Sequence, residues 1–146
     1  MNKPNSIRIF DRLFWASTLI GVLNFLFNLN ETSEKFANSP ELAAAGFGMG
    51  FIVTTFTVSM MLNILIWYFI SARASRIAKW ILIVFFVVGL FSIIRNLNNP
   101  IAPQGLAFGV FMLLTVMEGA ALYMLFRRDS LDWLSGKRSV DPDIFS

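Results

Sequence analysis

Four long apolar stretches, which together make up more than half of the chain, most constrain what this sequence can fold into. They cover residues 13–29, 47–70, 80–97 and 106–126. A helix needs about 20 predominantly apolar residues, within a range near 17–25, to cross the hydrocarbon core of a bilayer. All four stretches fall inside that range, and the segments between them are too short to hold a soluble domain. The sequence therefore predicts an all-α integral membrane protein, a four-helix transmembrane bundle that runs up-down-up-down in a single domain over residues 1–146.

The composition supports a membrane location and excludes several classes of function. Charged residues make up 14% of the chain, against about 25% in a typical soluble domain. The chain has no cysteine and no histidine, which excludes thiolate zinc sites, iron–sulfur clusters and histidine-ligated haem. The sequence contains no catalytic motif, so we predict that the protein is not an enzyme and has no cofactor and no metal site. The net charge of +3 reflects basic membrane flanks and not a surface that binds nucleic acid.

Basic residues predict the orientation of the four spans. Ten of the twelve Lys and Arg residues lie in the N-terminal tail, the second connection and the C-terminal tail, which share one side in a four-span protein. They are Lys3, Arg8, Arg12, Arg73, Arg76, Lys79, Arg127, Arg128, Lys137 and Arg138. The other two, Lys35 and Arg95, belong to the opposite side. The positive-inside rule then puts both termini, with tails 1–12 and 127–146, in the cytoplasm. We expect the cytoplasmic (inner) membrane of a bacterium.

The first apolar stretch has an alternative interpretation as a cleavable signal peptide, in which Lys3, Arg8 and Arg12 would form the basic n-region. Its apolar run of 17 residues contains Asn24 and Asn28. That run is longer and more polar than the apolar core of such a peptide, which has about 7–15 residues. A membrane span is therefore favoured.

Short amphipathic segments flank the bundle on its predicted cytoplasmic side. Ile7, Phe10 and Phe14 share one helical face before the first span, and Leu131 and Leu134 follow the fourth. One interpretation is an anchor in the membrane interface. The other is a helix that binds a partner.

Small residues predict where the helices contact one another. Helices in lipid associate by close packing and polar contacts, because burial of apolar side chains among apolar lipid tails gains little. Gly46 and Gly50 form one GxxxG pair, and Gly105 and Gly109 form another. We expect these four glycines at helix–helix contacts, within one chain or between chains. The predicted partners are thus the lipid bilayer and either a second copy of the chain, in a homo-oligomer, or another membrane protein.

One acidic residue lies inside a span. Glu118 is eight residues before Phe126, about 12 Å from the predicted inner edge at 1.5 Å per residue. Asn63, seven residues before Ile70, lies at a matching depth of about 10 Å, and Asn24 is a polar residue of the first span. A charged group at the centre of a span costs roughly 2.5–3.5 kcal/mol on insertion scales. Glu118, Asn63 and Asn24 therefore form a candidate polar site within the membrane.

Two functions are compatible with this site, and they differ in the surroundings that they require for Glu118. In the first, a protonated Glu118 hydrogen-bonds across helices to Asn63 or Asn24, and the chain is a non-catalytic structural or accessory subunit of a membrane assembly. In the second, Glu118 exchanges a proton in a small oligomeric proton-coupled transporter. A carboxyl group sealed between helices favours the first hypothesis, and a carboxyl group that lines a wet cavity favours the second.

A partial internal likeness suggests a tandem repeat of a helical hairpin. Residues 21–30 match residues 89–98 at four of ten positions, at an offset of 68 residues. Asn63 and its neighbours align with Glu118 and its neighbours at an offset of 55 residues, because the first extracytoplasmic loop is predicted to be the longer one. If the hairpin was duplicated, Asn63 and Glu118 occupy equivalent positions about a pseudo-two-fold axis. Otherwise the likeness is due to chance.

Overall fold

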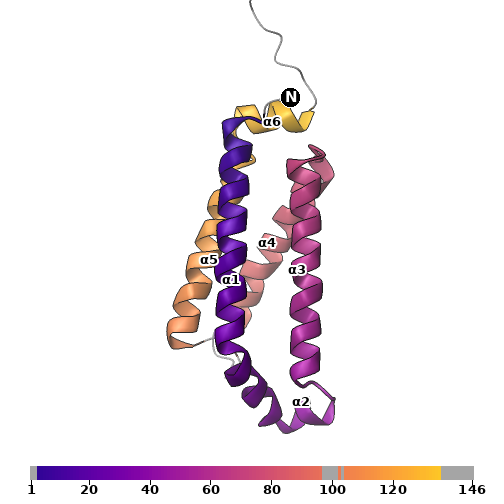
Figure 1. The fold of residues 1–146 in the computed structure, drawn as a ribbon, viewed down its shortest axis with the longest axis vertical. Helices are drawn as coiled ribbons and strands as arrows, with labels where there is room; N and C mark the ends of the chain where they lie inside the picture. The colour runs from indigo at the N-terminus through magenta and orange to yellow at the C-terminus, as the bar shows by residue number, and fades with distance from the viewer. Residues whose placement is uncertain (1–2, 97–101, 103, 136–146) are drawn as a thin grey trace, which may run out of the picture.

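Six helices make up the part of the chain that the structure, a computed structural model, describes: residues 3–96, 102 and 104–135 (Figure 1). In chain order they are α1 (Asn5–Ala37), α2 (Pro40–Ala44), α3 (Met49–Ser71), α4 (Arg76–Asn96), α5 (Gly105–Met124) and α6 (Arg128–Ser135). The long helices α1, α3, α4 and α5 run side by side, and the short helix α6 lies across the end of the bundle that carries the N-terminus (Figure 1). Leu97, the last residue of the third predicted span, and the basic residues Lys137 and Arg138 of the C-terminal tail fall outside the described residues.

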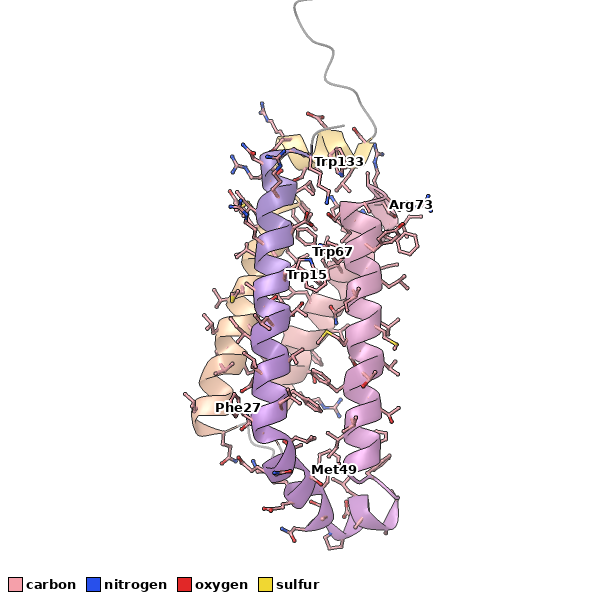
Figure 2. The ribbon with its side chains drawn as sticks, viewed as in Figure 1. Trp15, Phe27, Met49, Trp67, Arg73 and Trp133 are labelled. Carbon is pink, nitrogen blue, oxygen red and sulfur yellow. The ribbon has the colours of Figure 1, made fainter. Side chains whose placement is uncertain are left out.

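Within the described chain, the helices α1, α3, α4 and α5 are long and apolar enough to cross a membrane. Large side chains project outward along these helices (Figure 2), and Phe27 on α1 is 85% exposed. Contiguous apolar patches on soluble monomers rarely exceed a few hundred Å², because such surface is costly in water. The all-α architecture and the four apolar helices fit a small membrane protein.

Helix α1 extends beyond the predicted first span at both ends. It has 33 residues and is about 50 Å long at 1.5 Å per residue, whereas the hydrocarbon core of a bilayer is about 30 Å thick. The connection between the first two predicted spans, residues 30–46, is therefore helical in part, as the end of α1 up to Ala37 and as α2. Polar residues end the apolar span there, but no proline or glycine interrupts the helix. An ion pair one turn apart, from Lys35 Nζ to Glu31 Oε1 at 2.7 Å, supports this projecting part.

Helix α1 packs most extensively against α5, whereas α3 contacts α1 and α4 less extensively (Figure 1). A Cβ atom placed on Gly21 of α1 would lie 3.8 Å from Leu114 Cδ1 of α5. A Cβ atom on Gly119 of α5 would lie 3.5 Å from Phe86 Cζ of α4. Among the glycines of the described residues, Gly21 and Gly119 are thus the two that have a side chain of a neighbouring helix within van der Waals distance.

The glycines of the two GxxxG pairs do not mediate helix packing within one chain. Among the described residues, a Cβ atom on Gly46, Gly50, Gly105 or Gly109 would meet no atom within 4 Å. Gly46 and Gly105 have φ angles of +77° and +57°, in the left-handed region that glycine adopts without strain. Backbone conformation therefore explains these two glycines. Contacts between chains at Gly50 and Gly109 stay a prediction.

The best-packed part of the bundle lies at the end that carries α6. Buried apolar side chains from α1, α3, α4, α5 and α6 form one core cluster there, which consists of Ile7, Phe10, Ile66, Ile70, Ala78, Ala121, Leu122, Leu125 and Leu134. The interpretation of Ile7, Phe10 and Leu134 as anchors in the membrane interface was therefore wrong. Their side chains are buried against the protein's own helices, so they hold the two flanking segments on the bundle.

Candidate functional site

A cavity of about 320 Å³ lies between α1, α3, α4 and α5, and all four helices contribute to its wall. Most of the wall is apolar, and its aromatic part consists of Phe10, Phe14, Phe56, Phe85, Phe86 and Phe111. The polar side chains in the wall are fewer, namely Ser17, Thr18, Asn63, Thr115 and Glu118. Ligand pockets in proteins typically have volumes of about 300–1,000 Å³. This cavity therefore has the size and the lining of a site for a small, mainly apolar molecule.

Glu118 is the ionisable residue of the cavity wall within the described chain. Thr115 and Leu122, three residues before it and four residues after it, also line the cavity, because residues at these spacings share one face of a helix. Glu118 is an exposed residue, and no described side chain forms a hydrogen bond or an ion pair with its carboxyl group. Glu118 therefore borders the cavity, and the described helices do not enclose its side chain.

Asn63 lines the same cavity as Glu118, but Asn24 does not. The amide nitrogen of Asn63 donates to the carbonyl oxygen of Ser59 at 3.1 Å on its own helix. Asn24 accepts hydrogen bonds from Asn28 Nδ2 through its backbone oxygen at 2.7 Å and its side-chain oxygen at 3.0 Å. The structure thus brings two of the three predicted polar residues to one cavity, and the described contacts include no hydrogen bond between them.

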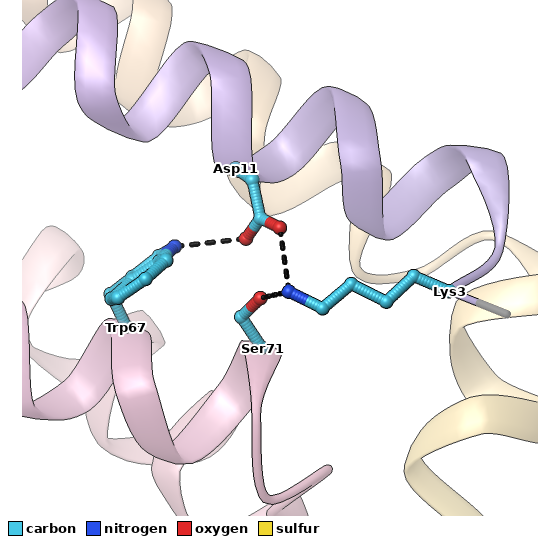
Figure 3. Close-up of polar contacts among 4 residues, drawn as sticks. All are labelled: Lys3, Asp11, Trp67 and Ser71. Carbon is cyan, nitrogen blue, oxygen red and sulfur yellow. Dashed lines mark hydrogen bonds and ion pairs between the residues drawn. The ribbon is translucent and has the colours of Figure 1, made fainter. Parts of the chain in front are cut away.

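A group of polar side chains that sequence analysis did not identify joins α1 to α3 near the end of the bundle that carries α6 (Figure 3). Lys3 Nζ lies 3.0 Å from Asp11 Oδ2 and donates to Ser71 Oγ at 2.6 Å. The indole Nε1–H of Trp67 donates to Asp11 Oδ1 at 2.8 Å. We call Lys3, Asp11, Trp67 and Ser71 the polar latch. The sequence feature that could have identified this group was the acidic Asp11 among the basic residues of the N-terminal segment.

Aromatic rings connect the polar latch to the cavity wall. The ring of Trp67 stacks on Phe14 with 5.9 Å between centroids and an interplanar angle of 16°. It also meets the edge of Trp15, with centroids 5.0 Å apart (Figure 2). Phe14 in turn lines the cavity. Phe14 therefore lies between the cavity and the indole of Trp67, which donates a hydrogen bond to Asp11.

A second set of polar contacts holds α6 on the start of α1. Asp129 Oδ2 accepts a hydrogen bond from the backbone N–H of Ser6 at 3.3 Å. The hydroxyl group of Ser130 contacts that of Ser6 and the backbone oxygen of Met124. Hydrogen bonds with Ser6, together with the charge of Arg127, hold the pKa of Asp129 below its usual value, although partial burial opposes this shift.

Within the part of the chain that the structure describes, no group of three or more His, Cys, Asp or Glu side chains is arranged to hold a metal ion. Comparison of the chain with protein-family models, with curated proteins and with solved structures finds no match. Its function must therefore be inferred from the cavity, from Glu118 and from the polar latch.

Proposed function

We propose that this chain is a small membrane transporter that binds a mainly apolar small molecule in the cavity and uses Glu118 as its proton-exchange group. In this proposal the four long helices cross a bacterial inner membrane up-down-up-down, with both termini in the cytoplasm. The observation that supports the proposal most directly is that Glu118 borders the cavity, with a side chain that the described helices do not enclose. Whether the carboxyl group of Glu118 is ionised then determines which charge a molecule bound in the cavity can carry.

The charges around the cavity limit the ligand to a neutral or singly positive molecule. Glu118 supplies at most one negative charge, and the described wall contains no Lys or Arg residue. Lys79, a nearby cation, lies 4.7 Å from the ring centroid of Phe126 and 5.5 Å from that of Trp80 instead. An anion would therefore meet a carboxylate without a compensating cation. A calcium ion needs about six to eight oxygen ligands, more than this wall supplies.

Proton exchange follows from competition for one carboxyl group. When Glu118 is ionised, it attracts a positively charged group, and the faces of the phenylalanine rings stabilise the same charge. When Glu118 takes up a proton, this attraction is lost and the molecule is released. One proton thus replaces one positive charge at the site, so a proton gradient drives the molecule in the opposite direction. Low pH should therefore weaken binding.

A structural or accessory subunit is the second candidate function, and one observation favours it. Gly50 and Gly109 occupy exposed positions with open space around them, as close contact with another membrane helix requires. This role needs no titration of Glu118, because a protonated Glu and a Gln both donate and accept hydrogen bonds. We propose no enzymatic activity under either function. The duplication that would relate Asn63 to Glu118 is likewise a proposal.

Infrared difference spectroscopy of the protein in lipid vesicles tests the transporter. We expect a carboxyl band whose intensity changes when the pH is varied over a wide range. This band should be present in the parent protein and missing from the Glu118→Gln variant. The matched control is Glu34→Gln, which makes the same chemical change on the part of α1 beyond the predicted span and should retain the band. A Glu118 carboxyl group that never titrates contradicts the transporter and supports the accessory role.

A further inference from the structure

We propose that the polar latch is a gate between the cavity and the aqueous phase at the end of the bundle that carries α6. This inference deepens the proposed function and rests on it, because a transporter must admit its ligand to the cavity from water. The gate works by separation of α3 from α1, which breaks the contacts that Asp11 makes with Trp67 and Lys3.

The latch continues the two helix faces that line the cavity. On α1, Asp11 lies three residues from the wall residue Phe14, and on α3, Trp67 lies four residues from the wall residue Asn63. Residues at these spacings are neighbours on one face of a helix. The hydrogen bond between Trp67 and Asp11 therefore closes the seam between α1 and α3 at the end of the cavity, one helical turn beyond Asn63 on α3 and beside the wall residue Phe10 on α1 (Figure 3).

The same seam is also closed on the other side of the cavity, by a contact of different chemistry. Phe25 of α1 and Phe56 of α3 stack with ring centroids 3.7 Å apart and an interplanar angle of 3°, and Phe56 lines the cavity. Stacked rings present no polar group to water. The latch consists of polar groups for which water competes, so it is the closure that an aqueous phase can open.

The latch is also weak enough to open while the fold persists. The Lys3 side chain is 37% exposed and that of Asp11 is 19% exposed, and a partly exposed ion pair contributes little net stability because water solvates both charges. A hydrogen bond likewise contributes only a small net free energy, since water replaces it when it breaks. Helix α1 keeps its more extensive contact with α5 when the latch opens.

Cysteine labelling tests the gate, and the absence of native cysteine makes single-cysteine variants straightforward. Ser17→Cys places the reporter at a buried position in the cavity wall, and Ala78→Cys places a control in the core cluster outside that wall. Each reporter is combined with Trp67→Phe, which retains a ring but removes the indole N–H, or with Asp11→Ala, which removes the carboxylate that both Trp67 and Lys3 contact. A charged, membrane-impermeant maleimide is then added to one side of sealed vesicles at a time.

The gate requires that either latch variant raise the labelling rate at position 17 about tenfold, as loss of one net hydrogen bond would, while the rate at position 78 stays constant. The increase must occur from the side of the termini. The double latch variant should add little to the Asp11 variant alone, because that variant already removes the acceptor of the Trp67 indole N–H. An unchanged rate at position 17, an equal rise at both reporters, or a rise from the opposite side overturns the gate. These outcomes do not depend on titration of Glu118, so the gate and the transporter can fail separately.

Discussion

The docking of α6 on the bundle can be tested with two leucines of the same short helix. Leu134 is 5% exposed and belongs to the core cluster, whereas Leu131 is 41% exposed. Replacement of a buried leucine by alanine costs about 2–5 kcal/mol. Leu134 lies at the edge of the cluster, where neighbouring side chains can relax into part of the space, so we expect about 2–3 kcal/mol for Leu134→Ala. The matched control Leu131→Ala should change stability by about 0.5 kcal/mol or less.

Hydrogen exchange of the α6 amides measures this difference directly. Helix α6 has eight residues, too few to persist in water without docking, so release from the bundle also exposes its amides. A loss of about 2–3 kcal/mol corresponds to exchange about 30- to 150-fold faster in Leu134→Ala, because each 1.4 kcal/mol is a factor of ten. Helix α1 should keep its protection. Equal exchange in the two variants would refute the idea that the buried leucine holds α6 in place.

Two further predictions follow from the pKa of Asp129 and from the glycines. The folded-state pKa of Asp129 is below its unfolded value of 3.8, so its contribution to docking is complete above the unfolded pKa and is lost as pH falls through the folded pKa. The protection of the α6 amides, relative to their intrinsic exchange rate at each pH, should therefore fall in acid below about pH 4, and the loss of protection should be smaller in Asp129→Asn. Gly50→Leu combined with Gly109→Leu should leave helicity and thermal melting of the single chain unchanged, because open space surrounds both positions. The same change should reduce the size of any oligomer in mild detergent, and an unchanged size would exclude these glycines from the contact.

The existence of the four long helices could be predicted from the sequence because hydropathy sums over about 20 residues and tolerates local exceptions. The ends of α1 could not be predicted from the sequence, because polar residues end a membrane span without ending the helix. Leu131 and Leu134 have the same chemistry and lie one turn apart, so only the position of α6 across the bundle decides which of them is buried.

The site was predicted in part for a related reason. Depth along a helix can be counted from the sequence, and the structure places both Glu118 and Asn63 in the wall of one cavity; their predicted hydrogen bond is not among the described contacts. The side of α1 on which Asn24 lies depends on the rotation of the helix about its own axis. The depth of a residue along the helix does not determine that rotation. Asp11 and Trp67 are 56 residues apart in the sequence. A count of basic residues treats Lys3 as an unpaired cytoplasmic charge, whereas its side chain is paired.

The unbroken course of α1 has a mechanical consequence. Its 33 residues contain no proline, and the helix is continuous, with its last part turned toward α2 (Figure 1). Under the proposed topology, a continuous helix about 50 Å long that pivots on α5 acts as a lever with one arm on each side of the membrane. Any tilt that carries the segment around Asp11 away from α3 must then swing the segment around Lys35 in the opposite direction. In that topology a single helix connects the two aqueous phases, so displacement at one surface is transmitted to the other without a change in secondary structure.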